Sequence, residues 1–153
     1  LRLLNPEFTE HAQIVAESTT ISLHTYPIKG TIKIEKDATI TGNVLCLSNM
    51  VVGGNLSVEG HCLEFYDLKI GHSFNIQVHT AELSLHDIHV GESIFLMGRR
   101  TGPVVLGDGI RCQDLVLHSI DKLVVQSEIR VDREIEIVEC QLESQGHQVI
   151  NGA

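Results

Sequence analysis

The sequence has no tryptophan, and aromatic residues make up only 4% of its 153 positions. The hydrophobic fraction, 42%, is nevertheless ordinary, and the chain is long enough for one domain with a continuous core. Short aliphatic and β-branched side chains therefore have to fill that core. This composition favours a narrow interior of stacked strands, where such side chains pack better than large rings.

Positive charge is also scarce, with 11 Lys and Arg residues against 20 Asp and Glu residues and a net charge of −9. This balance argues against a nucleic-acid or anionic-membrane partner, for which a basic surface is expected. No apolar run approaches the ~18 residues that a membrane span needs. The sequence has no G-x-S-x-G, P-loop, dinucleotide-binding glycine or H-E-x-x-H motif. These absences disfavour an enzyme, and we expect no cofactor, no metal and no catalytic residues.

The chain does contain a repeat of about 20 residues, each with three short apolar segments separated by tight corners. Side chains alternate along a strand, so each segment sends every second residue to the same side. The repeats fall at residues 20–34, 38–52, 55–70, 74–90, 93–112, 114–131 and, incompletely, from 134 onward. Repeats of this kind bury an apolar face only when they stack.

The sequence therefore predicts an all-β fold, a triangular β-solenoid or parallel β-helix with three short strands per coil and about six to seven coils. Its interior would hold aliphatic columns stacked coil on coil, for example Leu56, Ile76, Ile94, Leu115 and Ile135. Glycines after the third strand, where a positive φ is expected, are Gly53-Gly54, Gly71 and Gly91.

The N-terminal residues differ from the repeat. Asn5-Pro6-Glu7 is a helix-entry signal, with Asn as the N-cap, Pro at the first helical position and an acidic residue in the first turn. We expect a short helix from Pro6 to about Ala16 that covers the open end of the first coil. The chain would then divide into an N-terminal cap, residues 1–18, and a β-solenoid domain, residues 19–153.

The four cysteines do not suggest a disulfide framework. Cys46 and Cys62 share a face in adjacent coils, but their alignment differs by two residues, which exceeds comfortable bridging range. Cys112 takes an inward position and Cys140 a corner. Reduced thiols indicate an intracellular, cytoplasmic compartment. Because the chain begins at Leu1 without a signal-peptide pattern, we expect it to be excised from a longer protein.

Two groups of outward residues are candidates for binding a partner. The first lies at the corner after the first strand and consists of His24, His61, His79 and His118, with Arg99 and Arg100 on a long loop. Such an edge could hold an anion or a carboxylate-bearing partner near pH 6, or the corners could simply prefer polar residues. The second is an apolar patch, a possible lateral contact surface, where Phe95 and Val116 adjoin Val105 and Val124.

The third strands carry two outward columns of charge. One reads Asp67, Asp87, Gly109 and Glu128, and its neighbour reads Lys69, His89, Arg111 and Arg130. Coils stack about 4.8 Å apart, so each column repels itself, while diagonal pairing with the other column offsets that repulsion. The two columns are then either a solvated, mutually neutralising face or a docking face that recognises alternating charge.

The segments TIKIEKDATITGNV, VVGGNLSVEG and VGESIF, from Thr31 to about Ile94, resemble the bactofilins, which are polymer-forming cytoskeletal proteins of bacteria. The resemblance implies a right-handed, triangular β-helix and assembly through the ends of the helix without nucleotide. We therefore expect a non-catalytic scaffold or protein-interaction module that binds a protein partner or associates with itself.

Two other β-helical classes are alternatives. A carbohydrate-binding or carbohydrate-active β-helix of the pectate-lyase kind needs acids that hold Ca²⁺ and a cationic base on one sheet. The residues that could serve are those of the mixed columns, Asp67, Asp87, Lys69 and Arg111. A left-handed hexapeptide acyltransferase is suggested by Ile34 and Ile40, six residues apart, but the coil lengths do not keep a strict hexapeptide period.

Overall fold

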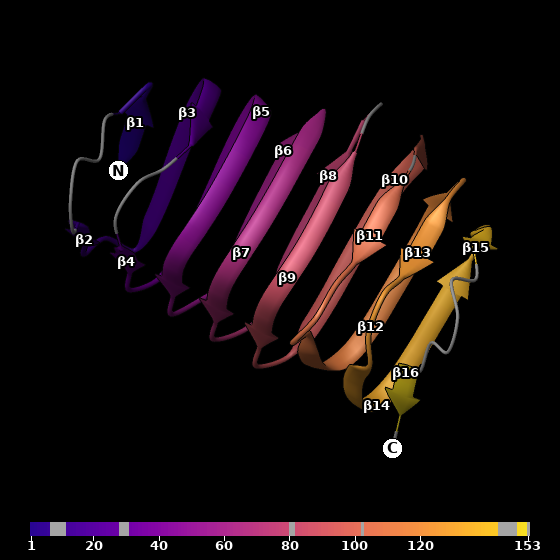
Figure 1. Ribbon diagram of the computed structural model, residues 1–153. Coiled ribbons are helices and arrows are strands. Elements are labelled where there is room, and N and C mark those ends of the chain that lie inside the picture. The colour runs from indigo at the N-terminus through magenta and orange to yellow at the C-terminus, as the bar shows by residue number, and fades with distance from the viewer. Residues whose placement is uncertain (7–11, 28–30, 80–81, 102, 144–149, 153) are drawn as a thin grey trace.

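The computed structural model describes residues 1–6, 12–27, 31–79, 82–101, 103–143 and 150–152. Its strands belong to one 16-stranded sheet that winds around the molecule, and strands pair in parallel with their equivalents in the neighbouring coils. Figure 1 shows the coils side by side, from the N-terminus at one end to the C-terminus at the other. The protein is therefore a β-solenoid, as the repeat predicts.

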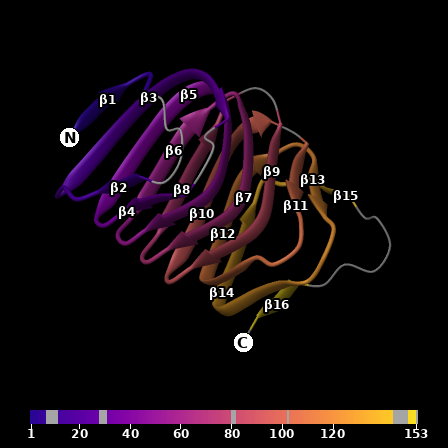
Figure 2. The same cartoon turned by 60° about the vertical axis from the view of Figure 1, so that its left-hand side comes forward.

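Each coil turns through three faces (Figure 2). The first face consists of β1 (Arg2–Leu4), the first parts of β3 (Ser18–Pro27) and β5 (Asp37–Val52), β6 (Leu56–Gly60), β8 (Phe74–Val78), β10 (Ser93–Thr101), and the later parts of β12 (Arg111–Ile120) and β14 (Ile129–Val138). The second face consists of the end of β3, the middle of β5, the first parts of β7 (Cys62–Ile70) and β9 (Leu83–Val90), β11 (Val104–Leu106), β13 (Leu123–Val125) and β15 (Leu142–Glu143).

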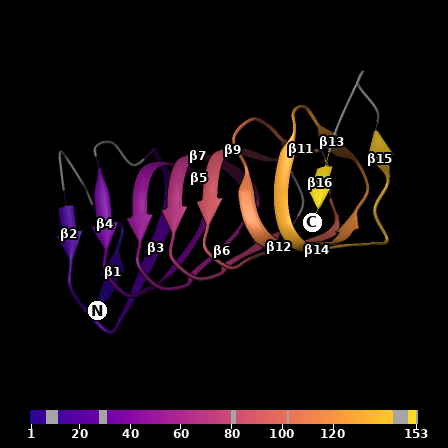
Figure 3. The same cartoon turned by 90° about the horizontal axis from the view of Figure 1, so that it is seen from below.

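The third face is a row of short segments, seen from below in Figure 3. It consists of β2 (Ala12–Ile14), β4 (Ile32–Ile34), the ends of β5, β7 and β9, the starts of β12 and β14, and β16 (Ile150–Gly152). Most of these segments have three residues, of which the outer two point into the core. In β7, for example, Leu68 and Ile70 are buried on either side of the exposed Lys69.

The inward side chains of the three faces form one continuous core. Leu56, Ile94 and Leu115 lie in one buried column of the first face, as predicted, but Phe74 takes the place predicted for Ile76. Ile76 is buried one inward position further along the strand. The predicted register is therefore wrong by two residues in this coil. The alternation of side chains does not reveal this error, because a shift of two residues keeps every side chain on the same side of the sheet.

The last predicted member of that column, Ile135, pairs with Leu115 but is 37% exposed. Near the middle of the solenoid the core also holds two aromatic rings, Phe65 and Phe74, whose centroids lie 5.5 Å apart. The interior is thus aliphatic, as the composition predicts, with one local aromatic contact.

The predicted N-terminal helix is wrong: the part of the chain that the structure describes contains no helix. Ala12–Ile14 form β2, which pairs in parallel with Ile32–Ile34 of β4, and Ile14 is only 8% exposed. This pairing satisfies backbone groups and buries Ile14, whereas a helix over these residues would leave β4 as an open edge. The remainder of the predicted helix, residues 7–11, lies outside the described residues.

The corner between the second and third faces places one residue in the left-handed region in four successive coils. These residues are Asn49 (φ 54°), Asp67 (φ 56°), Asp87 (φ 55°) and Gly109 (φ 74°). Asn, Asp and Gly are the residue types that adopt this conformation at least cost. The corner therefore has the same conformation in these four coils.

The glycines after the third face have a different role from the one predicted. Gly71 and Gly91 do not have a positive φ. A Cβ atom at Gly91 would lie 2.1 Å from the carbonyl oxygen of Gly71, and one at Gly71 would lie 2.2 Å from the carbonyl oxygen of Gly53. Close approach of successive coils, not backbone conformation, requires glycine here.

Candidate functional site

Three apolar side chains point outward from neighbouring strands of the first face. Phe95 of β10 pairs with Val116 of β12, and Met97 lies two residues after Phe95, on the same side of the strand. Phe95 is 42% exposed, Met97 is 44% exposed and Val116 is half-buried. Met97 was not among the predicted residues, although its spacing of two from Phe95 places it on the same side of the strand. We call Phe95, Met97 and Val116 the first-face patch.

The other half of the predicted apolar patch lies on the second face. Val105 of β11 pairs with Val124 of β13. Val105 is half-buried, but Val124 is only 4% exposed and offers almost no surface to a partner. The predicted patch therefore divides between two faces, and its exposed aromatic residue is on the first face.

Two of the predicted histidines form a close pair at the corner after the first face. The ring centroids of His61 and His79 lie 5.4 Å apart, and His79 Nε2 lies 2.6 Å from Glu59 Oε1. These three side chains border a hollow of about 340 Å³. The pair is a small polar site and does not extend into a strip.

The remaining members of the predicted histidine strip do not continue this pair. His118 aligns with Met97 in the neighbouring coil, two residues before the place that corresponds to His79. Arg99 is exposed and has a positive φ of 30°. The side chains of His24 and Arg100 lie outside the described residues.

Basic side chains occupy the same outward position in successive coils of the third face. In the observed register the outward residues read Gln13, Lys33, Val51, Lys69, His89, Arg111 and Arg130. Lys69, His89, Arg111 and Arg130 are therefore adjacent, as the sequence predicts. We call these four residues the basic column.

The basic column is only partly neutralised by its acidic neighbours. His89 Nε2 lies 3.3 Å from Asp87 Oδ1, and Arg130 Nε lies 3.8 Å from Glu128 Oε1. Among the described residues, the other two members of the column have no carboxylate within ion-pair distance. The predicted mutual neutralisation thus holds for half of the column.

A shallow groove of about 430 Å³ runs beside the basic column. One wall is formed by outward residues of successive coils, Val51, Lys69, His89 and Arg111, and the opposite edge by Gly53, Gly71 and Gly91. Between them lie Val52, Ile70 and Val90, whose side chains are buried in the core. None of the described residues that line it is acidic. We call this hollow the third-face groove. The sequence predicts the basic residues and the glycines as separate features, and the structure places them on opposite sides of one hollow.

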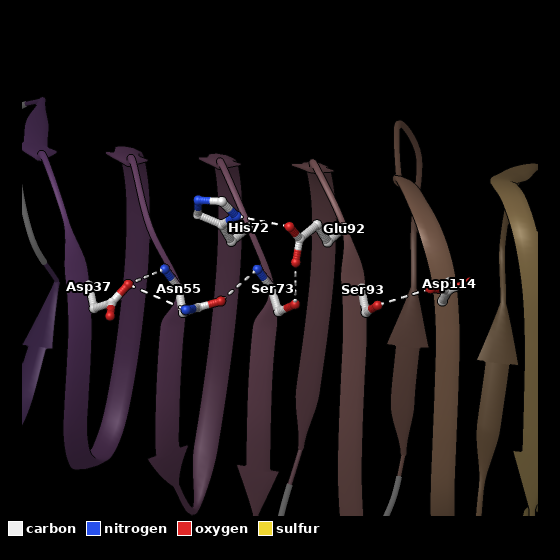
Figure 4. A network of polar contacts seen from close by, with 7 residues as sticks. All are labelled: Asp37, Asn55, His72, Ser73, Glu92, Ser93 and Asp114. Carbon is white, nitrogen blue, oxygen red and sulfur yellow. Dashed lines mark hydrogen bonds and ion pairs between the residues drawn. The ribbon is translucent and has the colours of Figure 1, made fainter.

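A ladder of polar side chains fixes the corner next to the groove (Figure 4). Asp37 Oδ1 accepts a hydrogen bond of 2.7 Å from the backbone N–H of Asn55, and Asn55 Oδ1 accepts one of 3.0 Å from the N–H of Ser73. Glu92 lies 2.9 Å from His72 Nδ1 and accepts a 3.4 Å bond from Ser73 Oγ. The hydrogen bond with His72 lowers the pKa of Glu92. The ladder ties successive coils together at the edge of the groove.

Two thiols, Cys46 and Cys112, have a raised pKa. Burial raises the pKa of Cys112 to about 12, and burial also raises the pKa of Cys46, with a further contribution from Glu64. Cys46 aligns with Glu64, and Cys62 aligns with Val44, so the predicted two-residue offset between Cys46 and Cys62 is confirmed. Thiols with a raised pKa are poor nucleophiles. Across the described part of the chain, no three His, Cys, Asp or Glu side chains gather closely enough to hold a metal ion.

In comparisons with protein-family models, curated proteins and solved structures, no match to this chain was found. Within the described residues, no helix has the length and apolar character that a membrane crossing would require. The case for a function therefore comes from two surfaces, the first-face patch and the third-face groove.

Proposed function

We propose that this chain is a β-helical scaffold that binds protein through the first-face patch, and that the partner is a second copy of the same chain. The supporting observation is the exposure of Phe95 and Met97, 42% and 44%, on strands whose positions the continuous core fixes. Exposed aromatic and Met side chains are typical anchors of protein interfaces. Holding them on a rigid sheet lowers the entropic cost of association.

The surroundings of the patch favour a second copy. Two sheets can pack face to face, and a twofold axis would bring the same surface of both copies together. In β8, Asn75 pairs with Phe95, and Gln77 pairs with Met97, so the flank of the patch on that side is uncharged. On the other side, His118 Nε2 lies 3.8 Å from Glu136 Oε2. The centre of such an interface would therefore avoid the repulsion expected from a net charge of −9.

The test is the mass of the protein in solution, measured by analytical ultracentrifugation over a range of concentrations. We expect the wild type to form a concentration-dependent dimer and the double variant Phe95→Gln/Met97→Gln to remain monomeric. Val44→Gln is the matched control, because Val44 is 43% exposed but lies on the second face. A wild-type monomer at every concentration, or a double variant that dimerises like the wild type, would refute the proposal.

Assembly through the ends of the helix, which the bactofilin resemblance implies, would give a different result. Head-to-tail contacts do not close, so the mass would grow without a fixed limit and filaments would be visible by electron microscopy. The double variant Phe95→Gln/Met97→Gln would leave such filaments intact. That outcome would favour an end-to-end scaffold over a face-to-face dimer.

A further inference from the structure

The chain has two methionines, and the structure places them in opposite surroundings. Met50 is an inward residue at the end of β5, on the third face, and is only 1% exposed. Met97 points outward from the first face and is 44% exposed. An oxidant has to reach the thioether sulfur to convert it into a sulfoxide. The fold therefore protects one methionine from oxidation and leaves the other open to it.

The neighbours of Met97 on both adjacent strands are polar. Gln77 of β8 pairs with Met97 on one side, and His118 of β12 pairs with it on the other, at the usual strand spacing of about 4.8 Å. Gln77 is exposed and His118 is half-buried. The amide and the imidazole both carry N–H donors. In the free subunit a small polar oxidant therefore approaches the sulfur through water and polar groups, and a sulfoxide oxygen has donors nearby.

The cysteines are less accessible to an oxidant than Met97. Cys112 is buried, Cys46 and Cys140 are half-buried, and Met97 is the exposed one among the sulfur-bearing side chains that the structure describes. Peroxides react with the thiolate form of cysteine, and the raised pKa of Cys46 and Cys112 keeps both thiols protonated. A thioether has no proton to lose, so the reaction at Met97 depends on access alone.

In the proposed dimer the same sulfur would lie among apolar side chains. A twofold axis brings the first-face patch of one copy against that of the other, and a methionine sulfur makes favourable contacts with an aromatic ring such as Phe95. None of the three side chains of the patch can donate a hydrogen bond. A sulfoxide oxygen would lose water on association without gaining a donor from the opposite patch, and an unsatisfied polar atom of this kind weakens an interface.

We propose that Met97 is an oxidation site for hydrogen peroxide and that its oxidation separates the dimer. The inference rests on the proposed function, because release requires a dimer formed through the first-face patch. The sulfur lone pair attacks one peroxide oxygen and the O–O bond breaks, so the sulfur is oxidised by two electrons and the peroxide is reduced. The hydroxyl group on sulfur then gives its proton, through water, to the leaving hydroxide, and the products are the sulfoxide and one water molecule. The oxidant reacts with the free subunit, and mass action then drains the dimer.

The test compares two variants that each keep one methionine. Met50→Leu keeps only Met97, and Met97→Leu keeps only Met50. Analytical ultracentrifugation measures each protein before and after treatment with hydrogen peroxide, and peptide mass spectrometry locates the added oxygen. In the native wild type we expect one oxygen atom on Met97 and none on Met50. The dimer dissociation constant of the wild type and of Met50→Leu should rise at least about tenfold on treatment, whereas that of Met97→Leu should be the same before and after it.

Three results would overturn the inference. They are equal oxidation of Met50 and Met97 in the native protein, an unchanged dissociation constant after complete oxidation of Met97, and dissociation of Met97→Leu on treatment, which would assign the effect to the thiols. Circular dichroism shows whether each oxidised protein is still folded, and unfolding in urea before treatment should make Met50 as reactive as Met97. A wild type that is monomeric before treatment refutes the proposed function and the release step with it, whereas a dimer whose Met97 resists peroxide refutes this inference alone.

Discussion

The glycines at the corner after the third face allow a specific prediction about stability. In Gly91→Ala the new Cβ would lie 2.1 Å from the carbonyl oxygen of Gly71, and relieving that contact requires the two coils to separate by about 1 Å. Such a shift would lengthen the 2.8 Å hydrogen bond from Gly91 N–H to the Ile70 carbonyl beyond useful range. Overpacking and the weakened bond together should cost about 3 kcal/mol.

Gly109 provides the matched control for the same substitution. A Cβ atom there would lie 3.1 Å from Asp87 Oδ1, which can move, and 3.2 Å from Asp87 Cα, a contact that a shift of a few tenths of an ångström relieves. Gly109→Ala should therefore cost mainly the strain of a positive φ, about 1 kcal/mol. Gly109→Asn should cost less than Gly109→Ala, because Asn49 adopts the same conformation at the equivalent corner of another coil.

The assay is thermal unfolding followed by far-ultraviolet circular dichroism, with denaturant unfolding as a second measure. For a chain of this size, 1 kcal/mol shifts the midpoint by about 2–4 °C, so Gly91→Ala should lower it by about 6–12 °C and Gly109→Ala by about 2–4 °C. The reasoning fails if Gly91→Ala unfolds at the wild-type temperature or is less damaging than Gly109→Ala. Either result would mean that the coils can separate locally at little cost.

Three further substitutions or modifications test the core and the corner ladder. Since the folded pKa of Glu92 is lowered, its contact with His72 stabilises the protein above the ordinary carboxyl range, and that contribution is lost as the pH falls through the lowered pKa. His72→Ala should therefore raise the pKa of Glu92 in an NMR titration. Cys112, whose pKa burial raises to about 12, should resist iodoacetamide at pH 8 in the native protein and react after unfolding in urea, as read by mass spectrometry. Phe74→Ala should cost about 3–5 kcal/mol in denaturant unfolding because it leaves a cavity, whereas the exposed Phe95→Ala should change stability by about 0.5 kcal/mol or less.

The alternation of side chains was predictable from sequence, but the alignment of coils was less so. The outward series Lys69, His89 and Arg111 was found correctly because each third-face segment has a single outward residue, which leaves little choice of register. The first-face segments are longer, and Phe74 and Ile76 both fit an inward position. Alternation cannot distinguish them, because the pairing with the adjacent coil decides.

The other errors have a similar origin in contacts between coils. The helix-entry signal at Asn5-Pro6 is local, whereas β2 forms because Ile32–Ile34 of the next coil offers a partner. Gly91 suggested a positive φ, since sequence alone does not show the carbonyl of Gly71 that excludes a side chain. The third-face groove was not predicted for the same reason. One side of it is formed by the outward side chains of the basic column, and the other side is open because glycines follow the third face in successive coils.

Stacking therefore determines which positions of this solenoid are free to carry function. On the third face the two inward residues of each segment belong to the core, so only one outward residue per coil can vary. The first-face strands have several outward positions each, so Phe95, Met97 and Val116 can form a broader surface suited to another protein. Because the two surfaces lie on different faces, a dimer formed through the first faces would leave the third-face groove of each copy uncovered.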